Sequence, residues 1–165
     1  MLAIFKREFK SYFQNVIGWL FVAALLAVYG LYFYVYNLKN GYPYISYDLK
    51  GIGFIMMIAV PILTMRSLSD ERKTKTDQLM LTSPVSVGKI VAGKYFAMAA
   101  VYTIDIAIFA LSPLVLSIYG KVALSEAYVA LVGYWLYGLS CIAVGLFISS
   151  ISESVIISAI LTFAA

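Results

Sequence analysis

Histidine is absent from this 165-residue chain, and cysteine occurs only once, as Cys141. A single cysteine excludes an internal disulfide, and without histidine the usual Cys/His zinc and haem sites cannot be built. Charge is also scarce, since Asp, Glu, Lys and Arg make up 12% of the residues, against roughly 25% in soluble domains. These shortages argue against a soluble globular enzyme with a metal or other bound cofactor.

Long uncharged runs take the place of the missing charge. Val16 to Tyr36 would form a helix of about 31 Å at roughly 1.5 Å per residue, enough to cross a bilayer. Further spans are expected at Gly51–Met65 (extended toward Leu49 and Leu68), Tyr95–Ile118 and Ala127–Ser150. Pro61 predicts a kink near Met57, and Pro113 a break late in the third span.

The final apolar run, Ser154–Ala165, would reach only about 18 Å as a helix and ends without a polar residue. A carboxylate in mid-membrane is costly, so we expect the protein to continue beyond this fifth, truncated span. The predicted fold is an all-α, polytopic helical membrane protein, with residues 1–165 forming a single transmembrane domain.

Residues 1–14 are predicted to form an amphipathic helix that lies in the membrane interface. At 100° per residue, Leu2, Phe5, Phe9, Tyr12 and Phe13 share one face, while Lys6, Arg7, Glu8, Lys10, Ser11 and Gln14 fill the other. Ile4 does not fit this division. A secretory signal is the alternative, but the following apolar run is too long and lacks a cleavage motif.

The most polar stretch is Pro61–Pro84, which contains seven of the 20 charged residues. Ser69 can cap a helix that begins with Asp70 and Glu71, and Thr76 can cap a second turn. That turn would present Leu79, Met80 and Leu81 before Pro84 ends it. A solvated loop is the simpler interpretation, but the embedded apolar triplet favours docking to a cytosolic partner.

Basic residues near the span ends predict the orientation. With a cytoplasmic amino terminus, nine of the 12 Lys and Arg residues are inside and three, Lys39, Lys50 and Lys121, are outside. This asymmetry follows the positive-inside rule, so the polar stretch is expected in the cytoplasm. The same placement explains the net charge of +4 without nucleic-acid binding. Seven tyrosines between Tyr29 and Tyr47 would form an aromatic belt at the opposite interface, or alternatively a surface that stacks on substrate.

Asp105 is the one acid predicted deep within a span, and an intramembrane carboxylate is a functional candidate. The alternative is a neutral, structural Asp bonded to Tyr102, Thr103 or a serine. In the fourth span Cys141, Gly145 and Ser149 recur every four residues, a pattern that lets helices pack closely. Gly88–Lys94 has the spacing of a phosphate-binding loop, but Tyr95 replaces the required Ser or Thr, so we do not expect this chain to bind ATP.

Several of these segments together resemble the permease subunits of type-2 ABC transporters, especially the gliding-motility-associated and nitrous-oxide-maturation branches. The resemblance rests on Pro61–Arg66, Asp70–Arg72, Thr76, Leu79–Leu81, Pro84–Ser86 and Gly93–Lys94. Lys75 and Gln78 depart from the pattern of that branch, which often has Gly and Glu there.

The resemblance implies six spans and a homo- or heterodimer of permeases, with an accessory protein as a further partner. It also implies a cytosolic ABC subunit that binds the ATP and performs the hydrolysis, and a location in the cell inner (plasma) membrane. Residues 67–84 would be the cytoplasmic coupling segment, contacting the ATPase through Asp70, Glu71, Arg72, Thr76, Gln78, Leu79, Met80, Leu81 and Pro84. The expected role is ATP-driven transport, as an exporter associated with gliding motility.

A rival interpretation is a stand-alone secondary transporter or channel built around Asp105, which would need no ATPase. A simple membrane anchor is less consistent with five hydrophobic segments.

Overall fold

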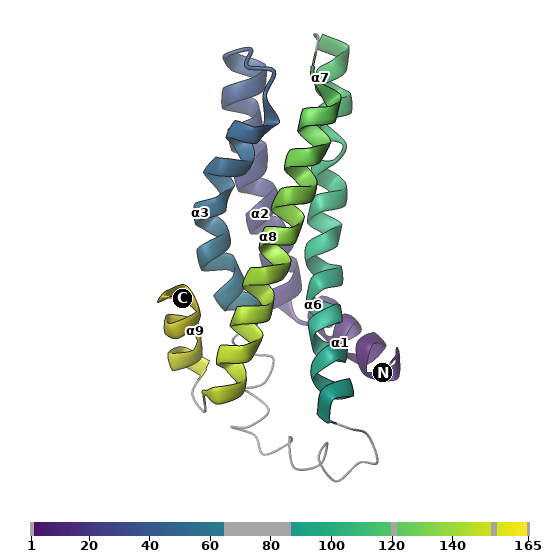
Figure 1. The fold of residues 1–165 in the computed structure, drawn as a ribbon, viewed down its shortest axis with the longest axis vertical. Helices are drawn as coiled ribbons and strands as arrows, with labels where there is room; N and C mark the ends of the chain where they lie inside the picture. The colour runs from purple at the N-terminus through teal and green to yellow at the C-terminus, as the bar shows by residue number, and fades with distance from the viewer. Residues whose placement is uncertain (1, 65–86, 120–121, 153–154, 165) are drawn as a thin grey trace.

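A computed structural model describes residues 2–64, 87–119, 122–152 and 155–164, and every described element is helical. Figure 1 shows long helices standing side by side, with one helix lying across the end of the bundle. In chain order the helices are α1 (Leu2–Gln14), α2 (Val16–Tyr32), the π-helical η1 (Phe33–Lys39), α3 (Ile45–Thr64), α6 (Val87–Phe109), α7 (Ser112–Tyr119), α8 (Leu124–Ile151) and α9 (Val155–Ala164).

Four helical stretches are long and apolar enough to cross a membrane: Gly18–Lys39, Ile45–Thr64, Gly88–Tyr119 and Leu124–Ile151. Many of their large apolar side chains are exposed, as expected where lipid rather than water covers a helix; Phe54 and Phe147, for example, are 65% and 66% exposed. The prediction of an all-α polytopic membrane protein is confirmed.

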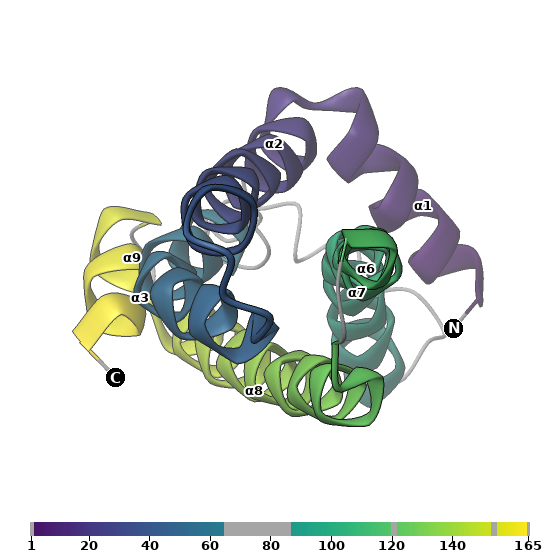
Figure 2. The ribbon, with the colours of Figure 1, turned by 90° about the horizontal axis from the view of Figure 1, so that it is seen from above.

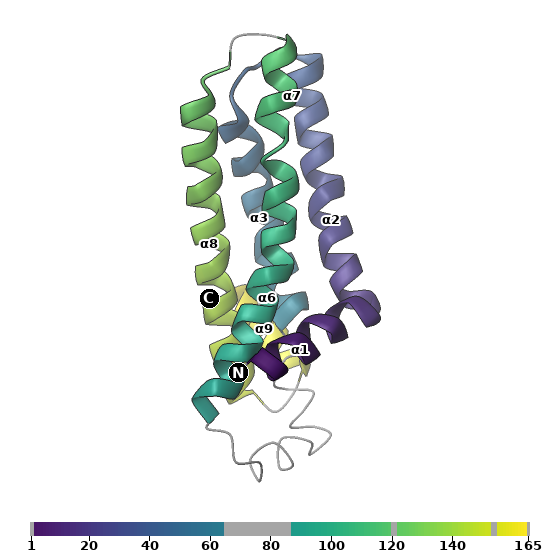
Figure 3. The same cartoon turned by 90° about the vertical axis from the view of Figure 1, so that its right-hand side faces the viewer.

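Seen from above, α2, α3, α8 and α6 enclose the interior of the bundle, and α9 packs outside it against α3 and α8 (Figure 2). Side chains from all four helices meet there; Leu25, Ile52, Met98 and Ile142 are fully buried. We call the end where α3 stops and α6 begins the α1 end, because α1 crosses it (Figure 3). We call the opposite end, formed by η1, residues 40–44 and α7, the tyrosine end.

The helix boundaries differ from the predicted spans where polar residues continue a helix. The second span begins at Ile45 rather than near Leu49, and the third begins at Val87 rather than Tyr95. The break near Pro113 is present, with α7 starting anew at Ser112. Proline fits at the second position of α7, because a first-turn residue needs no backbone N–H donor within the helix. The helix α3 continues through Pro61, and the kink near Met57 stays a prediction.

Candidate functional site: the α1 end and the buried polar groups

The predicted coupling residues Asp70, Glu71, Arg72, Thr76, Gln78, Leu79, Met80, Leu81 and Pro84 lie outside the described residues. The structure does describe the two helices that flank them. Both the last residue of α3, Thr64, and the first residue of α6, Val87, lie at the α1 end (Figure 1). The candidate site is therefore built from α1 and from the neighbouring ends of α3 and α6.

Aromatic side chains fix the angle between α1 and α2. Phe9 and Phe13 lie with ring centroids 5.0 Å apart, and Phe13 meets the Trp19 ring edge-on at 5.4 Å. The Trp19 indole N–H also donates to the backbone oxygen of Phe13 across 2.9 Å. A tryptophan bonded in this way spans the junction between the two helices. We infer that α1 keeps a defined direction relative to the bundle.

A second set of contacts holds α1 against α6. A Cβ atom added at Gly93 would come within 2.9 Å of Ile4 Cγ2, so only glycine lets the two helices approach this closely. Lys94, the next residue, places its Nζ 3.6 Å from Glu8 Oε2. The Lys94 side chain is only 1% exposed and that of Glu8 13%. The helix across the end of the bundle is thus joined to α6 by a largely buried ion pair.

This contact explains two departures from the predicted amphipathic pattern. Ile4, which did not fit either face, and Glu8, assigned to the polar face, are one helical turn apart and both contact α6. The Arg7 guanidinium lies 2.7 Å from the other Glu8 oxygen, Oε1, and its side chain is 57% exposed. Sequence reasoning used Lys94 as a topology signal, in the phosphate-loop spacing and in the family resemblance, and it missed the pairing with Glu8.

Asp105 lies in the interior of the bundle and is fully buried. Neither of its carboxyl oxygens has a hydrogen-bond partner among the described residues. The expected partners are bonded elsewhere: the Tyr102 hydroxyl donates to the Tyr134 backbone oxygen at 2.8 Å, and Thr103 Oγ1 donates to the Ala99 backbone oxygen at 2.7 Å. The predicted bonds from Asp105 to Tyr102 and Thr103 were therefore wrong.

The surroundings of Asp105 are nevertheless polar. Asp105 lies near enough to Tyr102 and Tyr134 to interact with both phenols electrostatically. The Tyr134 hydroxyl is also buried and, within the described part of the chain, has no hydrogen-bond partner. Asp105 thus faces a polar interior, and its functional role stays a prediction.

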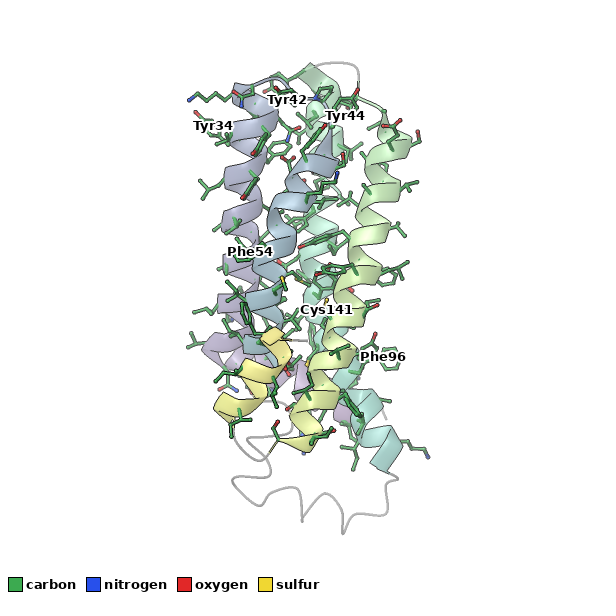
Figure 4. All side chains as sticks on the ribbon, turned by 60° about the vertical axis from the view of Figure 1, so that its left-hand side comes forward. Tyr34, Tyr42, Tyr44, Phe54, Phe96 and Cys141 are labelled. Carbon is green, nitrogen blue, oxygen red and sulfur yellow. The ribbon has the colours of Figure 1, made fainter. Side chains whose placement is uncertain are left out.

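The residues predicted to pack helices lie on the face of α8 that is turned toward α3 and α9. A Cβ atom at Gly145 would lie 2.7 Å from Thr64 Oγ1 and 3.0 Å from Thr162 Cγ2. Ser149 is fully buried one turn further on. Cys141 lines a mostly apolar hollow of about 230 Å³ between α3, α8 and α9, and Figure 4 places its sulfur within the lower half of the bundle.

The predicted aromatic belt contains only some of the seven tyrosines. Tyr34, Tyr42 and Tyr44 are exposed at the tyrosine end (Figure 4). Tyr29 instead points inward, where its ring stacks on Phe109 with centroids 4.0 Å apart. The Tyr32 ring fills the space beside Gly51 of α3. Counting aromatic residues along the chain could not separate the exposed tyrosines from the inward-facing ones, because both kinds occur in the same helical stretch.

A polar group near the tyrosine end was not predicted. Asn37 of η1 donates from Nδ2 to Asp48 Oδ2 in the first turn of α3, and both side chains are buried. The Tyr29 hydroxyl is hydrogen-bonded to Ser112 Oγ at the start of α7. One sequence feature indicated the Asn37–Asp48 pair: Asn37 is an amide that lies between apolar residues at the end of a span.

Comparison with known proteins identifies the family. The family described as ABC-2 family transporter protein matches residues 8–165, whereas no curated protein and no solved structure matches the chain. The match covers nearly the whole chain, including α1 from Glu8 onward and all four membrane-spanning stretches. Such permeases are transport subunits rather than enzymes, and the family implies a partner ATP-binding subunit in general. The chain belongs to the ABC-2 transporter family and is a multi-pass membrane permease of an ABC transporter.

Proposed function

We propose that this permease couples ATP hydrolysis by a separate cytosolic ABC subunit to export across the cell inner membrane. The observation that carries the proposal is the family match over residues 8–165, which extends across the segment between α3 and α6. A dimer of permeases would form the path, and the ATP would be bound by the partner subunits alone. The amino terminus would be cytoplasmic, because nine of the 12 Lys and Arg residues then lie on the inner side.

Residues 67–84 would receive the movement of the ATPase. They connect α3 and α6, whose facing chain ends both lie at the α1 end, and α1 is joined to α6 through Glu8 and Lys94. A push on this segment would therefore act on α3, α6 and α1 together. Rigid-body motion of packed helices is a common way for such a local displacement to open a path. Residues 1–14 would follow as an interfacial helix.

The finer family assignment rests on the residues around this segment. Pro61–Arg66, Asp70–Arg72 and Pro84–Ser86 resemble the gliding-motility-associated and nitrous-oxide-maturation branches. We propose that the chain belongs to this group, with a gliding-motility role and an accessory protein as a further partner.

The coupling proposal is tested with the full-length protein expressed together with its ATPase. Replacing Leu79, Met80 and Leu81 by Asp should abolish co-purification of the two subunits, because a docking face would lose its apolar contacts and gain three charges. A matched control places Asp at Tyr42 and Tyr44, which are exposed at the tyrosine end. Co-purification should survive in the control. Equal recovery of the ATPase with both variants would contradict the assignment of residues 67–84.

A further inference from the structure

Four buried, oxygen-bearing side chains gather below the tyrosine end of the bundle, each from a different element. They are Tyr29 of α2, Asn37 of η1, Asp48 of α3 and Ser112 of α7, with exposed fractions of 6%, 4%, 0% and 8%. Asn37 is hydrogen-bonded to Asp48, and Tyr29 to Ser112. Asp48 is also close enough to Tyr29 for the two groups to interact electrostatically. The four side chains therefore form one polar cluster.

The hydrogen bonds of this cluster leave acceptors without donors. Ser112 Oγ donates to the Phe109 backbone oxygen at 2.7 Å, so the Tyr29 hydroxyl must donate to Ser112. Asn37 donates from Nδ2 to one Asp48 oxygen. Asn37 Oδ1 and Asp48 Oδ1 remain, both buried and both without a hydrogen-bond partner in the described ranges. Two acceptor oxygens left without a donor need either a hydrogen-bond donor such as water or a ligand that supplies positive charge.

The charge of Asp48 favours a positively charged ligand. An ionised carboxylate that is removed from water needs a counter-charge, because its desolvation is otherwise very costly. No Lys or Arg side chain of the described residues forms an ion pair with Asp48. Lys50, two residues further on, instead holds its Nζ 5.8 Å above the ring of Tyr47.

The π-helical turn is what aims Asn37 into the bundle. In η1, Val35 and Leu38 are 41% and 48% exposed, whereas Asn37 is buried. Packing alone would bury an apolar side chain and leave the amide outside, so this turn reverses the usual preference. A change from α- to π-helical winding often accompanies a functional site. The local backbone thus serves to place the amide group of Asn37 beside Asp48.

We propose that Asn37 and Asp48, with Tyr29 and Ser112 beside them, bind a small monovalent cation. Carboxylate, amide and hydroxyl oxygens are the ligands of hard cations. A single carboxylate balances one positive charge, which favours Na⁺ over a divalent ion. The bound ion would join α2, α3 and α7 at the tyrosine end.

A hollow at the same end, which none of the four side chains lines directly, would be the route by which the ion approaches. It measures about 180 Å³ and lies between residues 43–46 and the start of α8, where Ile45 is three residues from Asp48. Glu126 contributes to its lining and is exposed. A carboxylate at the mouth would raise the local concentration of cations.

The test measures the thermal unfolding midpoint of the full-length permease in lipid nanodiscs. NaCl replaces N-methyl-D-glucamine chloride at constant ionic strength. We expect a saturable rise of the midpoint with Na⁺, because a ligand that binds only the folded state stabilises it by mass action. Asp48→Asn should abolish this rise. Asp105→Asn, which changes the other fully buried acid of the described residues, should keep it.

A second variant, Asn37→Asp, keeps the proposal testable if the Asp48→Asn protein does not fold. Asn37→Asp adds a second carboxylate at the same place, so its midpoint should respond to Ca²⁺ where the unaltered protein does not. The proposal is overturned if Na⁺ and N-methyl-D-glucamine give the same midpoints with the unaltered protein, as a protonated Asp48 would predict. A Na⁺ response that persists in Asp48→Asn would overturn it as well. None of these measurements involves the ATPase, so the result is independent of the proposed coupling.

Discussion

The ion pair between Glu8 and Lys94 predicts that removing its acid and removing its base cost the protein different amounts of stability. Glu8→Gln leaves the ammonium group of Lys94, 1% exposed, without this carboxylate. Lys94→Met removes the buried charge but keeps an apolar chain of similar length. It leaves Glu8 with Arg7, whose guanidinium lies 2.7 Å away. Losing the acid should therefore cost more stability than losing the base.

The distance between the two charges and the burial of Lys94 determine how much stability each variant should lose. Two charges 3.6 Å apart attract each other by about 5 kcal/mol at an effective dielectric constant of about 20. Removing one partner of a buried pair typically costs about 3–5 kcal/mol, because the other charge stays desolvated. The separation exceeds that of a short charged hydrogen bond, so we expect about 3 kcal/mol for Glu8→Gln. For Lys94→Met we expect about 1 kcal/mol, since an apolar replacement for a buried ion is often close to neutral.

The assay is a double-mutant cycle on the full-length protein in detergent, with unfolding by increasing SDS followed by circular dichroism. The double variant should cost clearly less than the sum of the two single variants, because the Glu8–Lys94 attraction can be lost only once. Arg7→Gln serves as the control and should cost less than about 1 kcal/mol, because its side chain is 57% exposed. Additive costs, or equal costs for Glu8→Gln and Arg7→Gln, would refute a coupling between α1 and α6 through this pair.

Two further predictions concern the interior of the bundle. Gly145→Leu should destabilise the protein by about 1–3 kcal/mol or more, because a Cβ atom there already meets a threonine of α3 at 2.7 Å. At Gly133 a Cβ atom would meet no atom of the other helices among the described residues within 4 Å, so the unfolding midpoint of Gly133→Leu should fall far less. Similar losses for both variants would contradict the packing role. Asp105→Asn should raise the SDS concentration at half-unfolding, since it replaces an ionisable buried group, to which no described residue donates a hydrogen bond, by a neutral amide. A marked loss of stability would instead indicate that the carboxyl has a bound partner.

The sequence was sufficient for the fold because the bilayer imposes strong conditions on it. An apolar run long enough to span must be helical, since only a helix satisfies its own backbone within lipid. For this reason Val16–Tyr36 and Ala127–Ser150 could be assigned from composition alone. Helix ends were less accurate, because charged residues such as Lys50 and Lys94 continue a helix when a neighbour or the interface accommodates the charge. Nothing local distinguishes such a lysine from one that ends a span.

The contacts between helices could not be predicted in the same way, because they depend on which faces meet. Glu8 and Lys94 are 86 positions apart, and neither pattern of spacing nor composition relates them. The sequence nevertheless contained a trace of each contact. Ile4 did not fit the apolar face of its helix, and in the fold it packs beside Gly93. Asn37 stood among apolar residues at a span end, and in the fold it turns inward to Asp48.

These two departures have a common physical basis. A helix that faces only lipid and water can be described by one apolar and one polar face. A residue that breaks this division is stable only if a third surface, another helix, receives it. Burying a polar group without a hydrogen-bond partner costs much free energy. A polar residue that breaks the division therefore restricts which helix can pack against it more strongly than an apolar residue does. On this argument Asn37 and Glu8, rather than the many exposed tyrosines, are the residues whose replacement should most change how the helices of this permease are held together.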